Sequence, residues 1–117
     1  MPPSRLQELV AFVEEMGREY TLRMNCYGHA GDGNLHVNFL SMAGTDQEQR
    51  ETDEGVRLLF AKTLALGGTL SGEHGIGITK KVFLSQEFDA PTLRFMTRLK
   101  HALDPTACLN PGKIFQN

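Results

Sequence analysis

Residues 23–40 alternate between apolar and polar side chains on both sides of the dipeptide Asp32-Gly33. Alternation with a period of two is typical of a β-strand with one buried face. Asp-Gly between two such runs is a strong hairpin signal, because a type I′ turn needs positive φ at both central positions. The segment therefore predicts an antiparallel hairpin, and the rest of the chain must cover its apolar face.

A turn centred on these two residues fixes the pairing of the strands. Counting outward places His29 opposite His36 on one face, with Cβ atoms about 5 Å apart. Two imidazoles at that separation can bind one divalent metal ion, although histidines beside a turn are also commonly just solvated. The same register sends five apolar side chains to the other face: Met24, Cys26, Leu35, Val37 and Phe39. A slip of one residue would mix the two faces.

Apolar residues at helical spacing predict three helices, over residues 4–22, from Asp46 to Gly67-Gly68, and over about Ala90–Leu103. Ser4 and Gln7 have the spacing of a capping box. Pro91 suits the first turn of the last helix, and the residues after it, with two prolines, predict an irregular tail. The expected fold class is α+β, with one hairpin or small sheet and helices packed on one face. No linker-like stretch divides the chain, which predicts a single domain over residues 1–117.

Composition narrows the classes of partner. A net charge of −2 disfavours a nucleic-acid partner, and no apolar run approaches the ~20 residues that span a bilayer, so membrane association is not indicated. The start, MPPSRLQELV, lacks the pattern of a signal peptide. Cys26 and Cys108 form no disulfide framework and are expected to be reduced thiols. We therefore expect a cytoplasmic protein.

The segment SGEHGIG places Glu73 and His74 side by side among glycines. A carboxylate is a hard oxygen ligand, and histidine is the side chain that exchanges a proton most readily near neutral pH. Flanking glycines allow a ligand to approach the backbone closely. The pattern is not the GxGxxG of a dinucleotide site. A plain exposed turn remains the alternative. His101, in the last turn of the third predicted helix, is expected to interact with the helix dipole and not to bind a ligand.

Three segments together resemble a known family: GHAGDGNLHVNF (28–39), GGTLSGEHGIGITKK (67–81) and LDPTACLNPGKIF (103–115). Their order and approximate spacing are similar to those in the C-terminal cap, or substrate, domain of FAD-linked oxidases of the vanillyl-alcohol oxidase type. The resemblance is closest to the branch that contains the glycolate oxidase flavoprotein subunit, D-lactate dehydrogenase and D-2-hydroxyglutarate dehydrogenase. It extends over most of the chain.

The resemblance implies a role for each matching residue. His29, His36 and Glu73 would bind a divalent metal, zinc or an ion such as manganese or iron. Asn38 and His74 would contact the substrate, with His74 as the base. Two further residues, Asn110 and Lys113, would lie near the flavin. Lys80 matches a basic position to which no role is assigned.

The resemblance also implies an activity, the oxidation of a D-2-hydroxy acid of the glycolate or D-lactate type to the 2-oxo acid with FAD as cofactor. Those oxidases are several hundred residues long, and their flavin domain precedes the matching part. We therefore expect FAD to be bound mainly by a flavin domain of a longer protein or by a separate subunit, and the isolated chain to be inactive. Two other functions stay open: a metal-binding module without catalysis, which would self-associate as a homodimer, and a zinc hydrolase with Glu73 as base.

Overall fold

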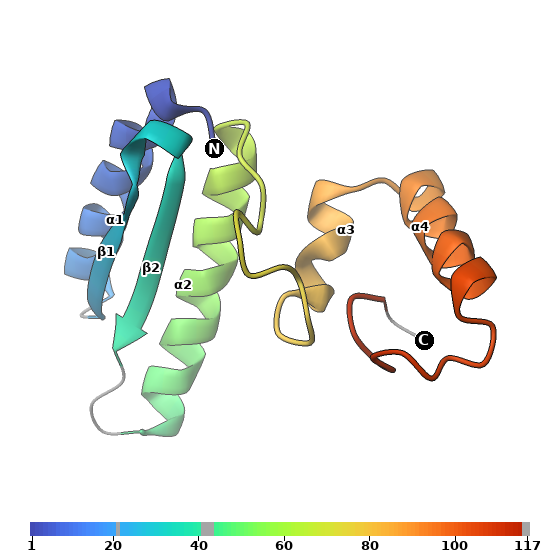
Figure 1. The fold of residues 1–117 in the computed structure, drawn as a ribbon. Coiled ribbons are helices and arrows are strands. Elements are labelled where there is room, and N and C mark those ends of the chain that lie inside the picture. The colour runs from blue at the N-terminus through green and yellow to red at the C-terminus, as the bar shows by residue number, and fades with distance from the viewer. Residues whose placement is uncertain (21, 41–43, 116–117) are drawn as a thin grey trace. The chain divides into compact units, whose positions relative to one another are not determined.

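The computed structural model describes residues 1–20, 22–40 and 44–115. Within these residues it contains four α-helices and one two-stranded antiparallel sheet, so the predicted α+β class is confirmed (Figure 1). The elements in chain order are α1 (Leu6–Glu19), β1 (Arg23–His29), β2 (Asn34–Leu40), α2 (Asp46–Ala65), α3 (Leu84–Glu87) and α4 (Ala90–Leu103). Short 3₁₀ turns occupy Pro3–Arg5, Ala30–Asp32 and Lys81–Phe83. None of the helices formed by these residues is long and apolar enough to cross a membrane.

The chain divides into two compact units, Met1–Gly72 and Glu73–Asn117, which we call the hairpin unit and the C-terminal unit. In the hairpin unit, α1 and α2 pack against the β1–β2 hairpin (Figure 1). The buried side chains of its core are Leu9, Val13, Met16, Leu59 and Leu66. Four of the five side chains predicted for the apolar face pack against this core, namely Met24, Leu35, Val37 and Phe39. The division of the hairpin into an apolar and a polar face is therefore confirmed.

The start of α1 differs from the prediction. The capping box of Ser4 and Gln7 is wrong, because Ser4 lies inside the 3₁₀ turn Pro3–Arg5 and α1 begins only at Leu6. A capping residue needs an extended backbone, whereas Pro3 favours the tight turn that encloses Ser4. Arg5 precedes the helix, and no side-chain cap bond is found there among the residues that the structure describes.

The helix α2 begins and ends where the sequence predicts. Thr45 caps it by accepting a hydrogen bond from the Glu48 amide, 3.2 Å away, and Gly67 follows its end with a φ of +75°. Gly55 lies in its interior and faces Phe39 of β2: a Cβ at this position would lie 2.8 Å from the Phe39 ring. The missing side chain thus lets the helix approach the hairpin closely.

The C-terminal unit contains the Glu-His turn, α3, α4 and an irregular tail; the sequence predicted α4 and the tail, but the apolar spacing did not predict the short helix α3. Asp89 caps α4 by accepting a hydrogen bond from the Thr92 amide at 2.9 Å. Hydrogen bonding to the Thr92 side chain, and then to its amide, holds the pKa of Asp89 below its usual value. Among the described residues of α4, none is buried, and the side chains of Phe95 and Leu103 are 68% and 77% exposed. The apolar spacing thus predicted the helix correctly, but among residues 1–20, 22–40 and 44–115 no residue of α4 belongs to a buried core.

Candidate functional site

The hairpin turn differs from the predicted two-residue turn. The last paired residues are His29 and Asn34, and Tyr27 lies opposite His36. Residues 30–32 form a 3₁₀ turn, which a bond from the Gly33 amide to the Ala30 carbonyl closes at 3.2 Å. Of residues 30–33, which make up this loop, Gly33 is the one with positive φ. The predicted His29–His36 pairing is therefore wrong. A type I′ turn would force Asp32 into the left-handed region, whereas the longer loop needs only a glycine there.

The error shifts the register by two residues and so leaves the faces unchanged, because side chains alternate with a period of two. His29 and His36 still point to the same side of the hairpin, now as diagonal neighbours. Diagonal side chains of an antiparallel pair have Cβ atoms roughly 7–8 Å apart. Two imidazoles at that separation still reach one ion lying between them.

His36 is held by its neighbours on the polar face. Its ring stacks on Tyr27 with centroids 5.0 Å apart and an angle of 19° between the planes. The side-chain amide of Asn34 lies 3.4 Å from His36 Nε2. These contacts orient the half-buried His36 ring, whereas His29, at the end of β1, is exposed.

Asn38 lies on the same polar face, opposite Asn25 in the register. Its side-chain amide donates a hydrogen bond to Asn25 Oδ1 at 3.0 Å. This bond restricts the rotation of the Asn38 side chain, which lies two residues from His36 on the same face. The position suits a residue that hydrogen-bonds a small polar ligand.

The strand after Asn34 meets the glycine that precedes the Glu-His turn. A Cβ at Gly72 would lie 2.5 Å from Asn34 Oδ1, so only glycine fits here without a shift of the Asn34 side chain. Gly72 and Glu73 are joined by a peptide bond, which holds their Cα atoms 3.8 Å apart. The chain leading into Glu73 therefore runs beside Asn34, the cross-strand partner of His29.

Glu73 and His74 lie in a turn of the C-terminal unit. Glu73 Oε2 is 3.9 Å from His74 Nε2, and the two side chains are 47% and 74% exposed. Gly75 and Gly77 have φ of +72° and +58°, a conformation that side chains rarely adopt. The predicted glycine-rich turn is thus confirmed, and its shape depends on these glycines. Partial burial lowers the pKa of the nearby Lys80 amine.

Asn110 and Lys113 lie in the tail that follows α4, and both are exposed. Asn110 has a φ of +48°, a region in which asparagine is among the least strained residues. Its carbonyl accepts a hydrogen bond from the Lys113 amide at 3.4 Å. The two residues therefore belong to one turn.

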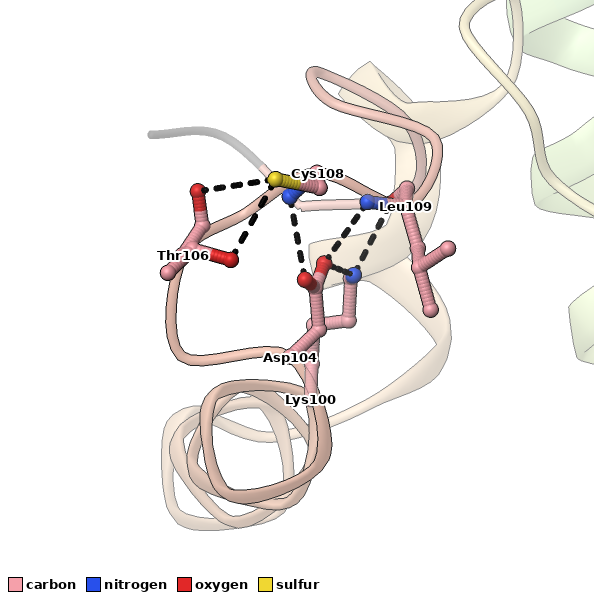
Figure 2. Close-up of polar contacts among 5 residues, drawn as sticks. All are labelled: Lys100, Asp104, Thr106, Cys108 and Leu109. Carbon is pink, nitrogen blue, oxygen red and sulfur yellow. Dashed lines mark hydrogen bonds and ion pairs between the residues drawn. The ribbon is translucent and has the colours of Figure 1, made fainter.

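Sequence analysis missed the cluster that shapes this tail. Asp104, 5% exposed, accepts hydrogen bonds from the Cys108 and Leu109 amides at 3.0 Å each and pairs with Lys100 (Figure 2). The bond from Lys100 and the two amides hold the pKa of Asp104 below its usual value, against the effect of burial. The available signal was an aspartate directly after a helix, four residues beyond a lysine.

Comparisons with known proteins show the family of this chain. Residues 1–114 match the family described as FAD linked oxidases, C-terminal domain. The chain belongs to this family.

Similar curated proteins include the glycolate oxidase subunit GlcD of Bacillus subtilis (strain 168), 34% identical over 98% of this chain and 24% of its own length. A D-lactate dehydrogenase of Anaerostipes hadrus is 36% identical over 97% of this chain and 24% of its own length. A D-2-hydroxyglutarate dehydrogenase of Xanthomonas citri pv. viticola (strain LMG 965 / NCPPB 2475 / ICMP 3867 / CFBP 7660) is 41% identical over 77% of this chain and 20% of its own length. The chain thus spans about a fifth to a quarter of the length of these relatives.

Proposed function

We propose that this chain is the substrate- and metal-binding part of an FAD-dependent enzyme that oxidises a D-2-hydroxy acid of the glycolate or D-lactate type to the 2-oxo acid. Membership of the family supports the flavin chemistry, and the names of the relatives support the substrate class. The observation that carries the proposal is the match of residues 1–114 to this family. Within the hairpin unit, the contact of Gly72 with Asn34 holds the end of that unit beside the histidine face.

The residues suit a divalent metal ion. Two imidazoles on one face, from His29 and His36, and the carboxylate of Glu73 form a donor set typical of zinc, manganese or iron sites that keep open positions. The Asn34 amide nitrogen beside His36 Nε2 can only donate, so it favours the tautomer with the proton on Nδ1. Metal binding at Nδ1 would require Asn34 to present its amide oxygen to the Nε2–H, as partners of metal-ligating histidines commonly do. When bound, the metal ion would supply a positive charge that polarises the hydroxyl of the substrate.

The remaining polar groups have separate tasks in this proposal. The Asn38 amide, restrained by Asn25, hydrogen-bonds the substrate and orients it. The His74 imidazole accepts the proton of the hydroxyl as a general base. The His74 side chain is exposed, so a small 2-hydroxy acid can reach its imidazole.

The hydride from the α-carbon needs an acceptor that no side chain provides, and FAD supplies this chemistry when bound. Asn110 and Lys113, on one turn of the tail, are proposed to face the flavin. Because the chain spans only part of its relatives, we propose that FAD is held mainly by a flavin domain elsewhere in a longer protein or in a partner subunit. Titration of the purified chain with FAD should show no tight binding; submicromolar affinity would contradict this division of roles.

The metal content of the purified chain tests the proposal. We expect bound divalent metal at neutral pH by elemental analysis, strongly reduced in His29→Ala, His36→Ala and Glu73→Gln. The matched control is His101→Ala, since His101 is an exposed histidine of α4 outside the proposed site. Loss of metal in the control alone, or a wild-type chain without metal after incubation with zinc or manganese, would contradict the proposal. Hydrolysis of ester probes without flavin would instead favour a zinc hydrolase.

A further inference from the structure

The tail after α4 is attached at its start by the Asp104 cluster. Besides the bonds that Asp104 accepts from the Cys108 and Leu109 amides, Lys100 Nζ donates to the Leu109 carbonyl at 2.8 Å (Figure 2). The Cys108 thiol adds a contact of 3.2 Å with Thr106 Oγ1. The first six residues of the tail are therefore folded back onto the end of the helix.

The tail is attached a second time at its far end, to the glycine-rich turn. The Ile114 amide donates to the Gly77 carbonyl at 2.8 Å, and Lys81 Nζ donates to the Gly112 carbonyl at 3.2 Å. The Lys81 bond joins residues 31 positions apart and is partly buried. Two segments that are separated along the chain, residues 77–81 and 112–114, are thus bonded to each other within the C-terminal unit.

Asn110 lies between these two attachments, and Lys113 lies within the second one. Their side chains are exposed while the backbone around them is held. A lysine side chain that is ordered in one conformation loses conformational entropy, so its contact needs a compensating gain. A charged donor to a backbone carbonyl is among the stronger hydrogen bonds and supplies such a gain. Lys81 is therefore the side chain that fixes where Asn110 and Lys113 lie relative to the His74 turn.

We propose that Lys81 is a positioning residue: through the Gly112 carbonyl it sets the distance between the turn that bears His74 and the turn that bears Asn110 and Lys113. The part that concerns function rests on the proposed function, in which one turn contacts the substrate and the other the flavin. The contact itself stands apart from that function, because it is made within one unit and needs neither metal nor flavin.

Amide hydrogen exchange of the whole chain, followed residue by residue by NMR, tests the proposal. Loss of one hydrogen bond to a charged group predicts roughly tenfold faster exchange of the Ile114 amide in Lys81→Met. The Leu109 amide, held by Asp104 at the other end, should exchange at its wild-type rate. Lys81→Arg, whose guanidinium also reaches a carbonyl, should restore the protection of Ile114. Arg98→Met, an exposed basic residue of α4, is the matched control and should change neither amide.

An unchanged Ile114 rate in Lys81→Met, an equal loss of protection at Leu109, or a failure of Lys81→Arg to restore protection would each overturn the proposal. If Lys81→Met does not fold, a measurement on the wild-type chain still tests the proposal. The Lys81 ammonium protons should then exchange at least several-fold more slowly than those of Lys113, and equal rates overturn the proposal. Slow exchange at Lys81 together with a chain that binds no metal would refute the proposed function and leave the positioning contact intact.

Discussion

Met16 of α1 is 2% exposed, whereas Leu103 of α4 is 77% exposed, although both lie on the apolar stripe of an amphipathic helix. The stripe of α1 is covered by α2 and the hairpin, while the stripe of α4 has no comparable cover in the described part of this chain. In the C-terminal unit, polar contacts to Asp104 and Lys81 hold the tail that follows α4. An apolar stripe thus predicts that a segment is helical, but whether the stripe is buried depends on whether another element covers it.

The two units also present their proposed ligands in different ways. His36 projects from a strand and is held by stacking on Tyr27, so its position follows from the packing of the hairpin unit. Asn110 projects from an irregular tail, so its position follows from a few hydrogen bonds. Substitutions in the first unit should therefore affect global stability, and those in the second should have local effects.

The largest expected effect comes from Met16→Ala. Removing a fully buried side chain leaves a cavity in the core and should lower the free energy of unfolding by about 2–5 kcal/mol. Urea denaturation followed by circular dichroism measures it. Leu103→Ala is the control in the C-terminal unit and should change stability by less than about 0.5 kcal/mol. Equal losses for the two variants would show that α4 is buried against something and would remove the contrast between the units.

Gly28→Ala should come next. A Cβ at Gly28 would lie 2.1 Å from the Asn34 backbone oxygen, so the strands must move apart beside His29. We expect a loss of about 1–3 kcal/mol, the usual range for overpacking, and weaker metal binding. Gly31→Ala offers a matched control, because a Cβ there has no atom within 4 Å among the residues described. A Gly28→Ala chain as stable as Gly31→Ala would contradict the observed register.

A smaller and local effect is expected for Asp104→Asn. The neutral side chain loses the ion pair with Lys100, so the Cys108 and Leu109 amides should exchange faster while amides of the hairpin unit do not change. NMR hydrogen exchange measures both sets in one sample. Faster exchange throughout the hairpin unit would show that the two units unfold together.

The same carboxyl predicts a pH dependence. Because the pKa of Asp104 is lower in the folded chain than its ordinary value of 3.8, the carboxylate contributes stability above about pH 4. That contribution should be lost as the pH falls from there through the lowered pKa. Wild-type Leu109 should therefore lose protection in acid, and Asp104→Asn should show a much flatter profile. Loss of protection on raising the pH from 4 to 7 would contradict this sign.

The smallest effect should follow Glu54→Gln on α2. Glu54 pairs with Arg57 at 2.6 Å, and this hydrogen bond lowers the pKa of Glu54, but both side chains are exposed. Exposed ion pairs of this kind contribute little to stability. Thermal melts of the variant and the wild type should coincide. A clear drop in melting temperature would show that this exposed ion pair contributes substantially to the stability of the hairpin unit, contrary to the prediction.

Local sequence signals predicted much of the fold. Pro91 and the apolar spacing gave the bounds of α4 as Ala90–Leu103, and Gly67 marked the end of α2. The register of the hairpin could not be read from Asp32-Gly33, because this dipeptide fits two kinds of loop. It can form a two-residue turn, or it can end a longer loop in which only the glycine has a left-handed backbone, as it does here. Periodicity nevertheless kept His29 and His36 on one face.

Contacts distant in the sequence were beyond prediction. The approach of Gly72 to Asn34 and the bond from Lys81 to Gly112 join positions 38 and 31 residues apart along the chain, and no local pattern encodes them. The Asp104 cluster is more local, and a lysine four residues before an aspartate at a helix end is a usable signal for it. Its importance for the tail became visible only through the two amides that it binds.

The central claim is that the polar face of the hairpin and the Glu-His turn bind one divalent metal ion. Paramagnetic broadening by substoichiometric Mn²⁺ in the NMR spectrum of the whole chain tests it most directly. We predict that the signals of His29, His36 and Glu73 disappear first, and that Glu73→Gln shifts this broadening to much higher Mn²⁺ concentration. Broadening that begins instead at the acidic start of α2, around Asp46, with the two histidine signals unchanged, would contradict the claim.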